Sequence, residues 1–551
     1  MKLELPIWKF IYGNQLFMTM EINNLKKKTL KIKTMKKKLF SLLLSIVVLT
    51  GCGSLVKKSS KEKESQLEYE ESWESLARHN EQPDWFQDAK LGIYFHWGIF
   101  SVPAFGDEWY PRWMHFETRD EYKHHLKTYR QPSEFGYHDF VPMFRAQNFN
   151  SEEWAELFKK AGARFAGPVA EHHDGFSMWD SEITPWNAMD KGPQKDITGE
   201  LEKSIKDRGM KFITTFHHAK HLQRYKGREQ EEIEKHKENI QNAFRNSHYP
   251  LFEGIPPSLD DSELNYLYGN IPEKKWLEEV WFGKLKEVID KYQPDIMWFD
   301  SWLDQIPEAY RQKFCAYYLN DAEKQGKEVV IVRKQDDLPL DVSVDDLEKS
   351  RKNRLEEKVW MTDETVSTSS WCYTENLQIK SAANLLHVLI DIVSKNGVLL
   401  LNISPKADGT IPDDQKDVLL KMGEWLDRYG EAIYETRPWY TYGEGPTKEP
   451  EGNFKNHLEF LKVKYSAKDV RYTKKGNVIY ASILGWPGNN QNVHLESFAI
   501  GEWKERKKIK NVSLLGYDGK IDYSLIGNGL LVSTPKNPIN EMAVVFKIEL
   551  D

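Results

Sequence analysis

At 551 residues the chain is longer than one ordinary domain, so we expect two or three domains, and its 40% of hydrophobic residues is enough to fill a large core. Aromatic residues make up 13% of the chain, including 19 tryptophans, which is compatible with carbohydrate binding although most tryptophans serve as core. The net charge of −7, without a basic patch interleaved with aromatic residues, excludes nucleic-acid binding, and three cysteines exclude a disulfide scaffold or a cysteine-rich zinc site.

The N-terminus has the pattern of a targeting signal. Lysines at positions 36–38 precede an apolar run at 39–49 that is too short to span a bilayer comfortably. The run ends in Leu49-Thr50-Gly51-Cys52, which resembles the lipobox of bacterial lipoproteins. The resemblance implies a lipid on Cys52 and a bacterial cell-envelope protein, periplasmic or at the outer surface, whose only membrane contact is that lipid. An ordinary signal peptide or an uncleaved anchor is the alternative.

Composition divides the chain into four parts. Because residues 1–34 do not fit a lipoprotein signal, we expect translation to start at Met35 rather than Met1. The parts are a leader comprising the N-terminal extension and signal peptide (1–52), a polar, charged tether (53–72), a catalytic domain (73–438) and a C-terminal domain (439–551).

In the larger domain, short apolar strands alternate with amphipathic helices, and each strand ends on polar or titratable residues. The pattern predicts an irregular (β/α)8 barrel of the TIM type. A doubly wound open sheet is the alternative, but no glycine-rich phosphate loop follows any strand. The predicted strands are 91–98, 164–170, 211–216, the stretch 294–302, 329–332, 359–361 and 398–401, and the clearest helices are 150–161, capped by Asn150 or Ser151, 197–208, 273–291 and 382–395.

The stretch 294–302 is central to this domain. Ile296, Met297 and Phe299 are apolar enough for a strand that is covered on both faces, and Asp300 stands where that strand should enter a loop. A carboxylate at the carboxyl end of a parallel barrel strand lies where this fold does its chemistry. The alternative is an aspartate that merely caps the next turn.

The C-terminal part has a different pattern. From about Trp439 onward, short alternating runs are punctuated by glycine, asparagine and proline, which predicts an antiparallel β-sandwich without a catalytic constellation. The runs are 458–463, 478–484, 493–498, 512–516, 530–533 and 542–548.

The polar residues at the strand ends should meet at the mouth of the barrel. They are His96, Glu108, Trp109, His172, His173, His217, Trp298, Asp300, Arg333 and a carboxylate between positions 345 and 364. A metal site could draw on the histidines with Asp174 and Asp300. However, no HExxH spacing is present and adjacent histidines at a strand end point to opposite sides, so we expect no metal and no other cofactor. A glycosidase needs two carboxylates around the anomeric carbon, with donors and an aromatic platform for the sugar.

Five motifs resemble those of the α-L-fucosidases, glycoside hydrolase family 29, over residues 73–551. They are His96-Trp97-Gly98, Glu108-Trp109-Tyr110, the run from His172 to Phe176, Trp298-Phe299-Asp300, and the run from Leu399 to Pro412. The resemblance implies a retaining exo-hydrolase that releases terminal α-linked L-fucose from a fucosylated oligosaccharide or glycoconjugate.

The resemblance also implies roles for individual residues. Asp300 would be the nucleophile. His96, Glu108, Trp109, His172 and His173 would hold the sugar hydroxyls, with His217, Trp298 and Arg333 close by. The methyl group of fucose needs an apolar pocket, for which Trp298, Trp371 and Phe100 are candidates.

The general acid/base is less clear from the sequence. Some family members carry a Trp-Glu pair where this chain has Trp360-Met361, so that glutamate is missing here. Counting back from Trp371 and Trp360 favours Glu348, with Asp346, Asp363 and Glu364 as the other candidates; each of them could instead be a solvated loop acid.

Three other functions remain open. A related barrel hydrolase acting on another sugar, such as an α-L-galactoside, would share the polar residues and differ around C6. A non-catalytic surface glycan-binding lipoprotein would keep the aromatic residues but need neither Asp300 nor Glu348. A metal-dependent hydrolase is the third.

Overall fold

The computed structural model describes residues 68–551 except 225–226, 244, 252–261, 451, 453–456 and 504–506. The predicted leader with Cys52, and most of the predicted tether, lie outside the described residues. Among the helices of the described residues, none is both long enough and apolar enough to cross a membrane.

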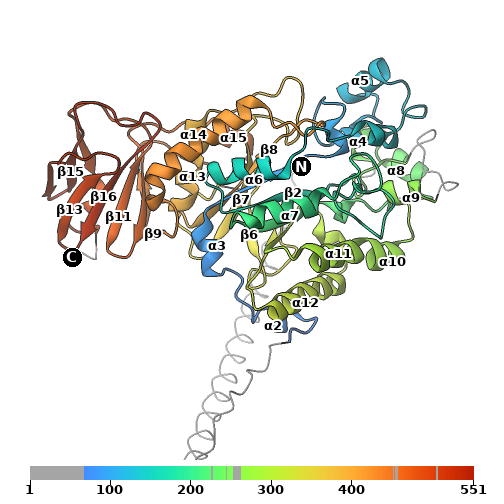
Figure 1. Ribbon diagram of the computed structural model, residues 1–551, viewed down its shortest axis with the longest axis horizontal. Coiled ribbons are helices and arrows are strands. Elements are labelled where there is room, and N and C mark those ends of the chain that lie inside the picture. Colours follow the sequence, from blue (N-terminus) through green and yellow to red (C-terminus); the bar gives the residue numbers. More distant parts are fainter. Residues whose placement is uncertain are drawn as a thin grey trace, which may run out of the picture. The chain divides into compact units, whose positions relative to one another are not determined.

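Eight parallel strands close into a barrel, which confirms the predicted fold (Figure 1). The first and last strands pair with each other, with Leu91 opposite Leu399, so the sheet has no free edge. The strands are β1 (Leu91–Phe95), β2 (Phe165–Glu171), β3 (Lys211–Phe216), β4 (Ile296–Phe299), β5 (Val330–Arg333), β6 (Val344–Asp346), β7 (Trp360–Thr365) and β8 (Gly397–Ile403).

Helices cover most of the barrel, and the strongest predicted ones are present. Asn150 caps α6 (Ser151–Lys160) by accepting hydrogen bonds from the backbone N–H groups of Glu152 and Glu153. The other major helices beside the barrel are α7 (Ile197–Asp207), α11 (Phe282–Tyr292), α12 (Glu308–Gln325), α13 (Ala382–Ser394) and α14 (Asp413–Tyr429). Residues 334–343 and 347–359, which connect β5 to β6 and β6 to β7, are described throughout and contain no helix.

The barrel has one strand that the sequence pattern did not predict. The strand β6 has only three residues, of which two are aspartates, so it lacks the apolar run that revealed the other seven. It pairs with β5 through Val332 and Val344 and with β7 through Asp346 and Met361, and it therefore completes the closed sheet.

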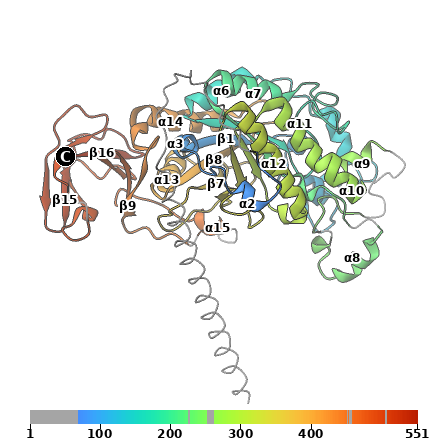
Figure 2. The ribbon, with the colours of Figure 1, turned by 90° about the horizontal axis from the view of Figure 1, so that it is seen from below.

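The barrel interior is filled by side chains and is closed at its amino-terminal end. Phe86, from the short helix α3 (Asp84–Ala89), joins Phe165, Ile213 and Ile296 in the interior cluster, and all four are fully buried. Helix α3 lies next to the barrel strands in both ribbon views (Figure 2). With this end plugged by apolar residues, polar chemistry is confined to the opposite, carboxyl end.

The C-terminal part forms two antiparallel sheets that share one apolar core, as expected for a sandwich. The first sheet has the order β13-β16-β11-β10-β9 and the second β12-β15-β14. The strands are β9 (Arg437–Glu444), β10 (Val470–Lys475), β11 (Val478–Ile483), β12 (Asn492–Leu495), β13 (Ile509–Leu514), β14 (Tyr523–Ile526), β15 (Gly529–Ser533) and β16 (Val544–Leu550).

The predicted pattern was wrong at four places in this region. The run 458–463 is not a strand, because the short helix α15 (His457–Phe460) occupies it, and β9, β10 and β14 were not predicted. These strands are either half-exposed or rich in charged and polar residues, so their alternation is weak.

The sandwich packs directly on the barrel helices. Trp425 of α14 donates its indole N–H to the carbonyl of Ala543 at 2.9 Å, and the barrel core continues into Tyr480, Leu484 and Val545 of the β-sheet. A buried ionic cluster joins Asp391 of α13 to Arg471 of β10 at 2.6 Å. The two parts therefore share both apolar and ionic contacts.

Candidate active site

Asp300 follows β4 and lies at the centre of a polar cluster at the carboxyl end of the barrel. Its backbone N–H donates to the carbonyl of Phe216 at 3.1 Å, which continues the strand pairing and fixes its position. Its Oδ2 lies 3.2 Å from His173 Nε2 and 3.3 Å from His217 Nδ1, and its Oδ1 accepts a hydrogen bond of 3.1 Å from Lys334 Nζ. The side chain is 14% exposed, so one approach to it stays open.

The neighbours of Asp300 keep its carboxylate ionised. Burial alone would raise the pKa of Asp300, but the Lys334 ammonium and His217 outweigh burial and hold this pKa well below its usual range. An ionised carboxylate with one open side is what a nucleophile needs.

Lys334 is a common partner of three carboxylates. Its Nζ lies 3.1 Å from Asp300 Oδ1, 3.1 Å from Glu348 Oε2 and 3.1 Å from Asp363 Oδ2, and it lies 4.8 Å from the centre of the Trp298 ring. Burial alone would lower the pKa of Lys334, but these carboxylates raise it well above its usual value, so the group stays an ammonium. One cation therefore balances several acids.

Lys334 occupies the place that the sequence analysis gave to Arg333. The Arg333 guanidinium donates to the carbonyl of Leu338 at 2.5 Å and faces Asp336 and Asp345, away from Asp300. Side chains alternate along a strand, so with Val332 inside the barrel, residue 333 points out and residue 334 points in.

The four acid/base candidates differ in burial and in their contacts with Lys334. Glu348 and Asp363 both contact Lys334, but Asp363 is fully buried and accepts a hydrogen bond from Tyr94 Oη, whereas Glu348 is 20% exposed. Asp346 is buried beneath them, where burial and the Asp363 carboxylate raise its pKa well above the usual range. Glu364 pairs with Lys380 at 2.8 Å outside this cluster. Only Glu348 combines contact with the cluster and access from solvent.

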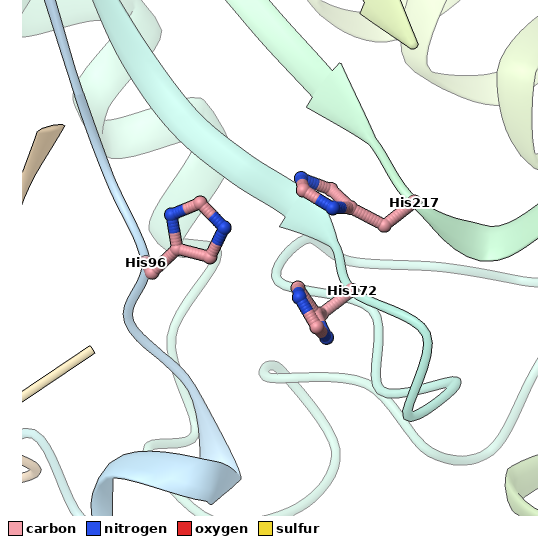
Figure 3. Close-up of side chains that lie close together, drawn as sticks. All are labelled: His96, His172 and His217. Atoms are coloured by element: carbon pink, nitrogen blue, oxygen red, sulfur yellow. The ribbon is translucent and has the colours of Figure 1, made fainter. Parts of the chain in front are cut away.

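Three histidines from three neighbouring strands converge (Figure 3). His96 follows β1, His172 follows β2 and His217 follows β3, and their ring centres lie between 4.6 and 5.5 Å apart. Asn402 fixes the orientation of His96: its Oδ1 accepts from the His96 backbone N–H and from Nδ1, at 2.9 and 2.8 Å. Nε2 of a neutral His96 is therefore an acceptor that faces the site.

Burial favours the uncharged form of His96 and His172. It lowers the pKa of His96 and His172 well below the usual range, with His217 adding to the effect. Burial also lowers the pKa of His173, to about 4, although Asp300 opposes the shift. His173 Nδ1 donates to the carbonyl of His217, which sets its ring. Neutral imidazoles can both donate to and accept from sugar hydroxyls.

Glu108, Trp109 and Trp371 form the wall above the histidines. Glu108 Oε2 accepts a hydrogen bond of 3.2 Å from the backbone N–H of Trp371, and burial, with help from Asp107, raises the pKa of Glu108 to about 8. The Trp371 ring stacks on His96 at 5.3 Å, and the Trp109 ring lies 5.0 Å from His173. The predicted residues from distant loops thus meet in one place.

Trp298 lies below this wall, not in it. It is fully buried in the barrel interior, where its ring contacts Tyr94 and His217 and supports Lys334 from beneath. Phe100 is almost fully buried against His172 at 5.1 Å, so it remains a candidate for an apolar contact with a sugar methyl group.

A cleft of about 690 Å³ opens over this cluster. Its lining includes Glu108, Trp109, Lys220, Arg245, Trp302, Glu348 and Trp371. This volume is within the range of small-molecule binding sites.

Two groups of side chains could offer ligands to a metal ion. Single ligand atoms of His96, His172 and His217, and of His173, His217 and Asp300, lie within 4.8 Å of one another. The adjacent His172 and His173 fall in different groups, but their ring centres lie 4.7 Å apart, so the expectation that they point to opposite sides was wrong. Zinc holds nitrogen ligands at about 2.0–2.1 Å, so either group would have to contract to bind it.

The sequence analysis missed two residues of this site. Lys334 could have been found from the alternation of β5. His248 is fully buried with its ring 5.4 Å from His173 and 5.3 Å from Trp109, and it comes from a loop after β3 that carries no strand or motif signal. For His248 the sequence offers no comparable clue.

A closed parallel barrel with a buried, ionised carboxylate, a second acid across a shared ammonium and an aromatic wall is the site of a glycoside hydrolase. The sequence profile of the α-L-fucosidase family matches residues 55–431, and that of the α-L-fucosidase C-terminal domain matches residues 464–549. The chain therefore belongs to the α-L-fucosidase family.

Individual relatives agree with this assignment. Human plasma α-L-fucosidase is 30% identical over 491 residues, which cover 87% of this chain and 91% of the relative. Human tissue α-L-fucosidase is 27% identical over 92% of this chain and 95% of the relative. Among solved structures, Thermotoga maritima α-fucosidase in complex with fucose has a TM-score of 0.67 at 27% identity, and the match covers 87% of this chain and all of that one.

Proposed function

We propose that the protein hydrolyses terminal α-L-fucosides with retention of configuration, with Asp300 as nucleophile and Glu348 as acid/base. The observation that carries this proposal is the pair of contacts made by Lys334 Nζ, 3.1 Å to Asp300 Oδ1 and 3.1 Å to Glu348 Oε2. The two carboxylate oxygens can be no more than twice that distance apart. Retaining glycosidases keep their carboxyl groups about 5–5.5 Å apart, and inverting ones about 6.5–9.5 Å.

The shared ammonium suits the charge movement of such a reaction. Asp300 attacks the anomeric carbon and forms a glycosyl ester while Glu348 transfers its proton to the departing oxygen. The negative charge thus leaves Asp300 and appears on Glu348, and Lys334 lies beside both groups. In the second step Glu348 takes a proton from the attacking water, the ester breaks, and Asp300 regains its charge.

The remaining polar residues would hold the sugar. Neutral His96, His172 and His173 offer donors and acceptors to its hydroxyls, and protonated Glu108 offers one more donor. Phe100 beside His172 offers an apolar surface for the C6 methyl group. A terminal sugar is favoured because the pocket ends at the barrel interior, where Trp298 fills the space.

The test is hydrolysis of a panel of aryl glycosides by the soluble protein beginning after Cys52. We expect release from the α-L-fucoside, little from the α-L-galactoside, and no loss of activity with a chelator. A fluorinated fucosyl donor should label Asp300, as detected by peptide mass spectrometry. Release from the galactoside alone would instead support the related barrel hydrolase, and loss of activity with the chelator would support the metal-dependent one.

A matched pair of variants assigns the nucleophile. Asp300→Ala should lower kcat by at least about a thousand-fold while leaving the fold intact, because Lys334 keeps Glu348 and Asp363 as partners. Asp304→Ala, an exposed aspartate four residues further on, is the control and should keep normal activity. Normal activity in Asp300→Ala would refute the assignment and favour a glycan-binding protein.

We also propose that Cys52 carries a lipid that anchors the protein in a bacterial cell envelope. The support is the lipobox-like sequence from Leu49 to Cys52 after a basic and apolar leader. Cells fed a labelled fatty acid should label the wild-type protein but not Cys52→Ser. An unlabelled wild-type protein would leave the alternative of an ordinary signal peptide.

A further inference from the structure

The cleft above the active site is placed to hold the leaving group of the proposed reaction. An acid/base must touch the oxygen that joins fucose to the rest of the substrate. Glu348 and Trp371 line the cleft, while Asp300 and the histidines lie below it. If fucose occupies the histidine pocket, the saccharide that leaves must therefore extend into the cleft of about 690 Å³.

Basic side chains outnumber acidic ones in the lining of this cleft. They are Arg112, Arg119, Lys220, Arg245 and Lys349. Arg119 pairs with Glu121 at 3.2 Å. The guanidinium of Arg112 donates to backbone carbonyls, including that of Ser247 at 2.7 Å. Lys349 donates to the carbonyl of Ser369 at 3.0 Å. These contacts satisfy the hydrogen-bond donors of both side chains but do not neutralise their charges.

Lys220 is a buried amine of this group. It is only 3% exposed, and its Nζ lies between two indoles, 4.5 Å from the ring centre of Trp109 and 3.9 Å from that of Trp302. In the part of the chain that the structure describes, no hydrogen bond or ion pair satisfies this amine, although the Asp300 carboxylate acts on it from further away. Charging a buried amine without an adjacent anion is costly, and an anionic ligand in the cleft would offset that cost.

The acids of the cleft offset only part of its basic charge. Burial raises the pKa of Glu108 to about 8, so this group is mostly neutral at pH 7, whereas Asp107, whose pKa burial raises to about 6, is mostly ionised. Burial, with the positive charges of Arg112, Arg245 and Arg224, lowers the pKa of Lys220 to about 6 although Asp300 opposes the shift, so without a bound anion this amine is mostly uncharged at pH 7. An anion seated beside it would raise this pKa and favour the ammonium.

We propose that this cleft binds an oxyanion carried by the saccharide from which fucose is released, either a sulfate ester or a carboxylate. Trp109 and Trp302 pack against a sugar ring, and Lys220 and Arg245 contact the oxyanion. This inference rests on the proposed fucosidase function and specifies its substrate class.

The test compares three disaccharides in which fucose is α-linked to galactose, to galactose 6-sulfate or to galacturonate. At low ionic strength, kcat/KM should be at least ten-fold higher for one of the two charged substrates than for the neutral one, and the better substrate identifies the source of the oxyanion. The advantage should shrink as salt is added. It should fall several-fold in Lys220→Met and in Arg245→Ala, and it should persist in Arg354→Ala, which removes an exposed arginine outside the cleft.

The outcomes separate this inference from the proposed function. If the neutral substrate is cleaved as well as both charged ones, or if the charged advantage survives in both cleft variants, the oxyanion site is refuted while the fucosidase assignment stands. If no fucoside is cleaved, the fucosidase assignment fails. In that case the binding of galactose 6-sulfate, galacturonate and galactose to Asp300→Ala is measured by titration. Equal affinity for all three sugars would refute the oxyanion site.

Discussion

A single ammonium group, that of Lys334, lies against Asp300, Glu348 and Asp363. We expect Lys334→Met to raise the pKa of Asp300, because an opposite charge at this distance lowers a carboxyl pKa by about 1–3 units. The acid limb of the kcat/KM profile should therefore move to higher pH by about one unit or more. Arg333→Met is the matched control, since its guanidinium faces away from Asp300. An unmoved acid limb in Lys334→Met would show that Lys334 does not set this pKa.

Glu108 should control the alkaline side of the profile. Its pKa is raised to about 8, so substrate binding that depends on its proton is intact below that pH and is lost as the pH rises through it. We expect KM to rise above pH 8 in the wild type and to stay flat in Glu108→Gln. Asp107→Asn removes a neighbouring negative charge, so the loss should then begin at lower pH. A flat wild-type KM would contradict the role of this proton.

Part of the site could be predicted from the sequence. His96, His172, His173, His217, Glu108 and Asp300 were predicted because each follows a strand or belongs to a recognisable motif, and the structure places them together. The prediction named Arg333 and not Lys334, because it did not take into account that side chains alternate along β5. His248 was missed because its position depends on how a long loop folds back over His173, which no local pattern encodes.

At the scale of elements, the short strand β6 places two acids at different depths. Asp346 is buried, and burial with the Asp363 carboxylate raises its pKa well above the usual range, whereas Glu348 reaches the cleft. Asp346→Asn keeps the shape of a buried group whose neutral form is favoured, and it should keep at least about a third of the activity. Glu348→Gln should lower kcat about a hundred-fold or more for poor leaving groups.

Added azide provides the decisive measurement for these two variants. An enzyme that lacks its acid/base is rescued by azide on a substrate with a good leaving group, because azide attacks the glycosyl ester without a general base. We expect rescue of Glu348→Gln, with formation of fucosyl azide. Rescue of Asp346→Asn instead would move the acid/base role to Asp346.

The same elements show where sequence patterns succeed. The helices α6, α7 and α13 were predicted near their observed ends because capping residues and apolar spacing are local signals. The strand β6 was not, because Val344, Asp345 and Asp346 become a strand only when the neighbours β5 and β7 supply hydrogen bonds. Closure of the barrel, and not the propensity of these residues, determines their conformation.

At the scale of the whole molecule, a buried ionic cluster connects the barrel to the sandwich. Asp391 is fully buried, with Lys395 Nζ at 2.8 Å, Arg471 Nε at 2.6 Å and Arg351 Nε at 3.5 Å. Asp391→Asn leaves Glu449 as the remaining acid beside Lys395 and Arg471, and it should lower the free energy of unfolding by about 3–5 kcal/mol in urea titrations. Asp417→Asn breaks only the exposed pair with Lys421 and should cost about 0.5 kcal/mol or less. Equal losses in the two variants would contradict the importance of the cluster.

The position of Lys334 has a consequence for inhibition. A sugar mimic with a positively charged ring nitrogen would be attracted to a carboxylate beside the anomeric position. Asp300 already has the Lys334 ammonium 3.1 Å away, so a second cation would meet repulsion as well as attraction. The enzyme should therefore discriminate against cationic mimics and in favour of neutral ones of the same shape. Replacing Lys334 with methionine should reverse that selectivity.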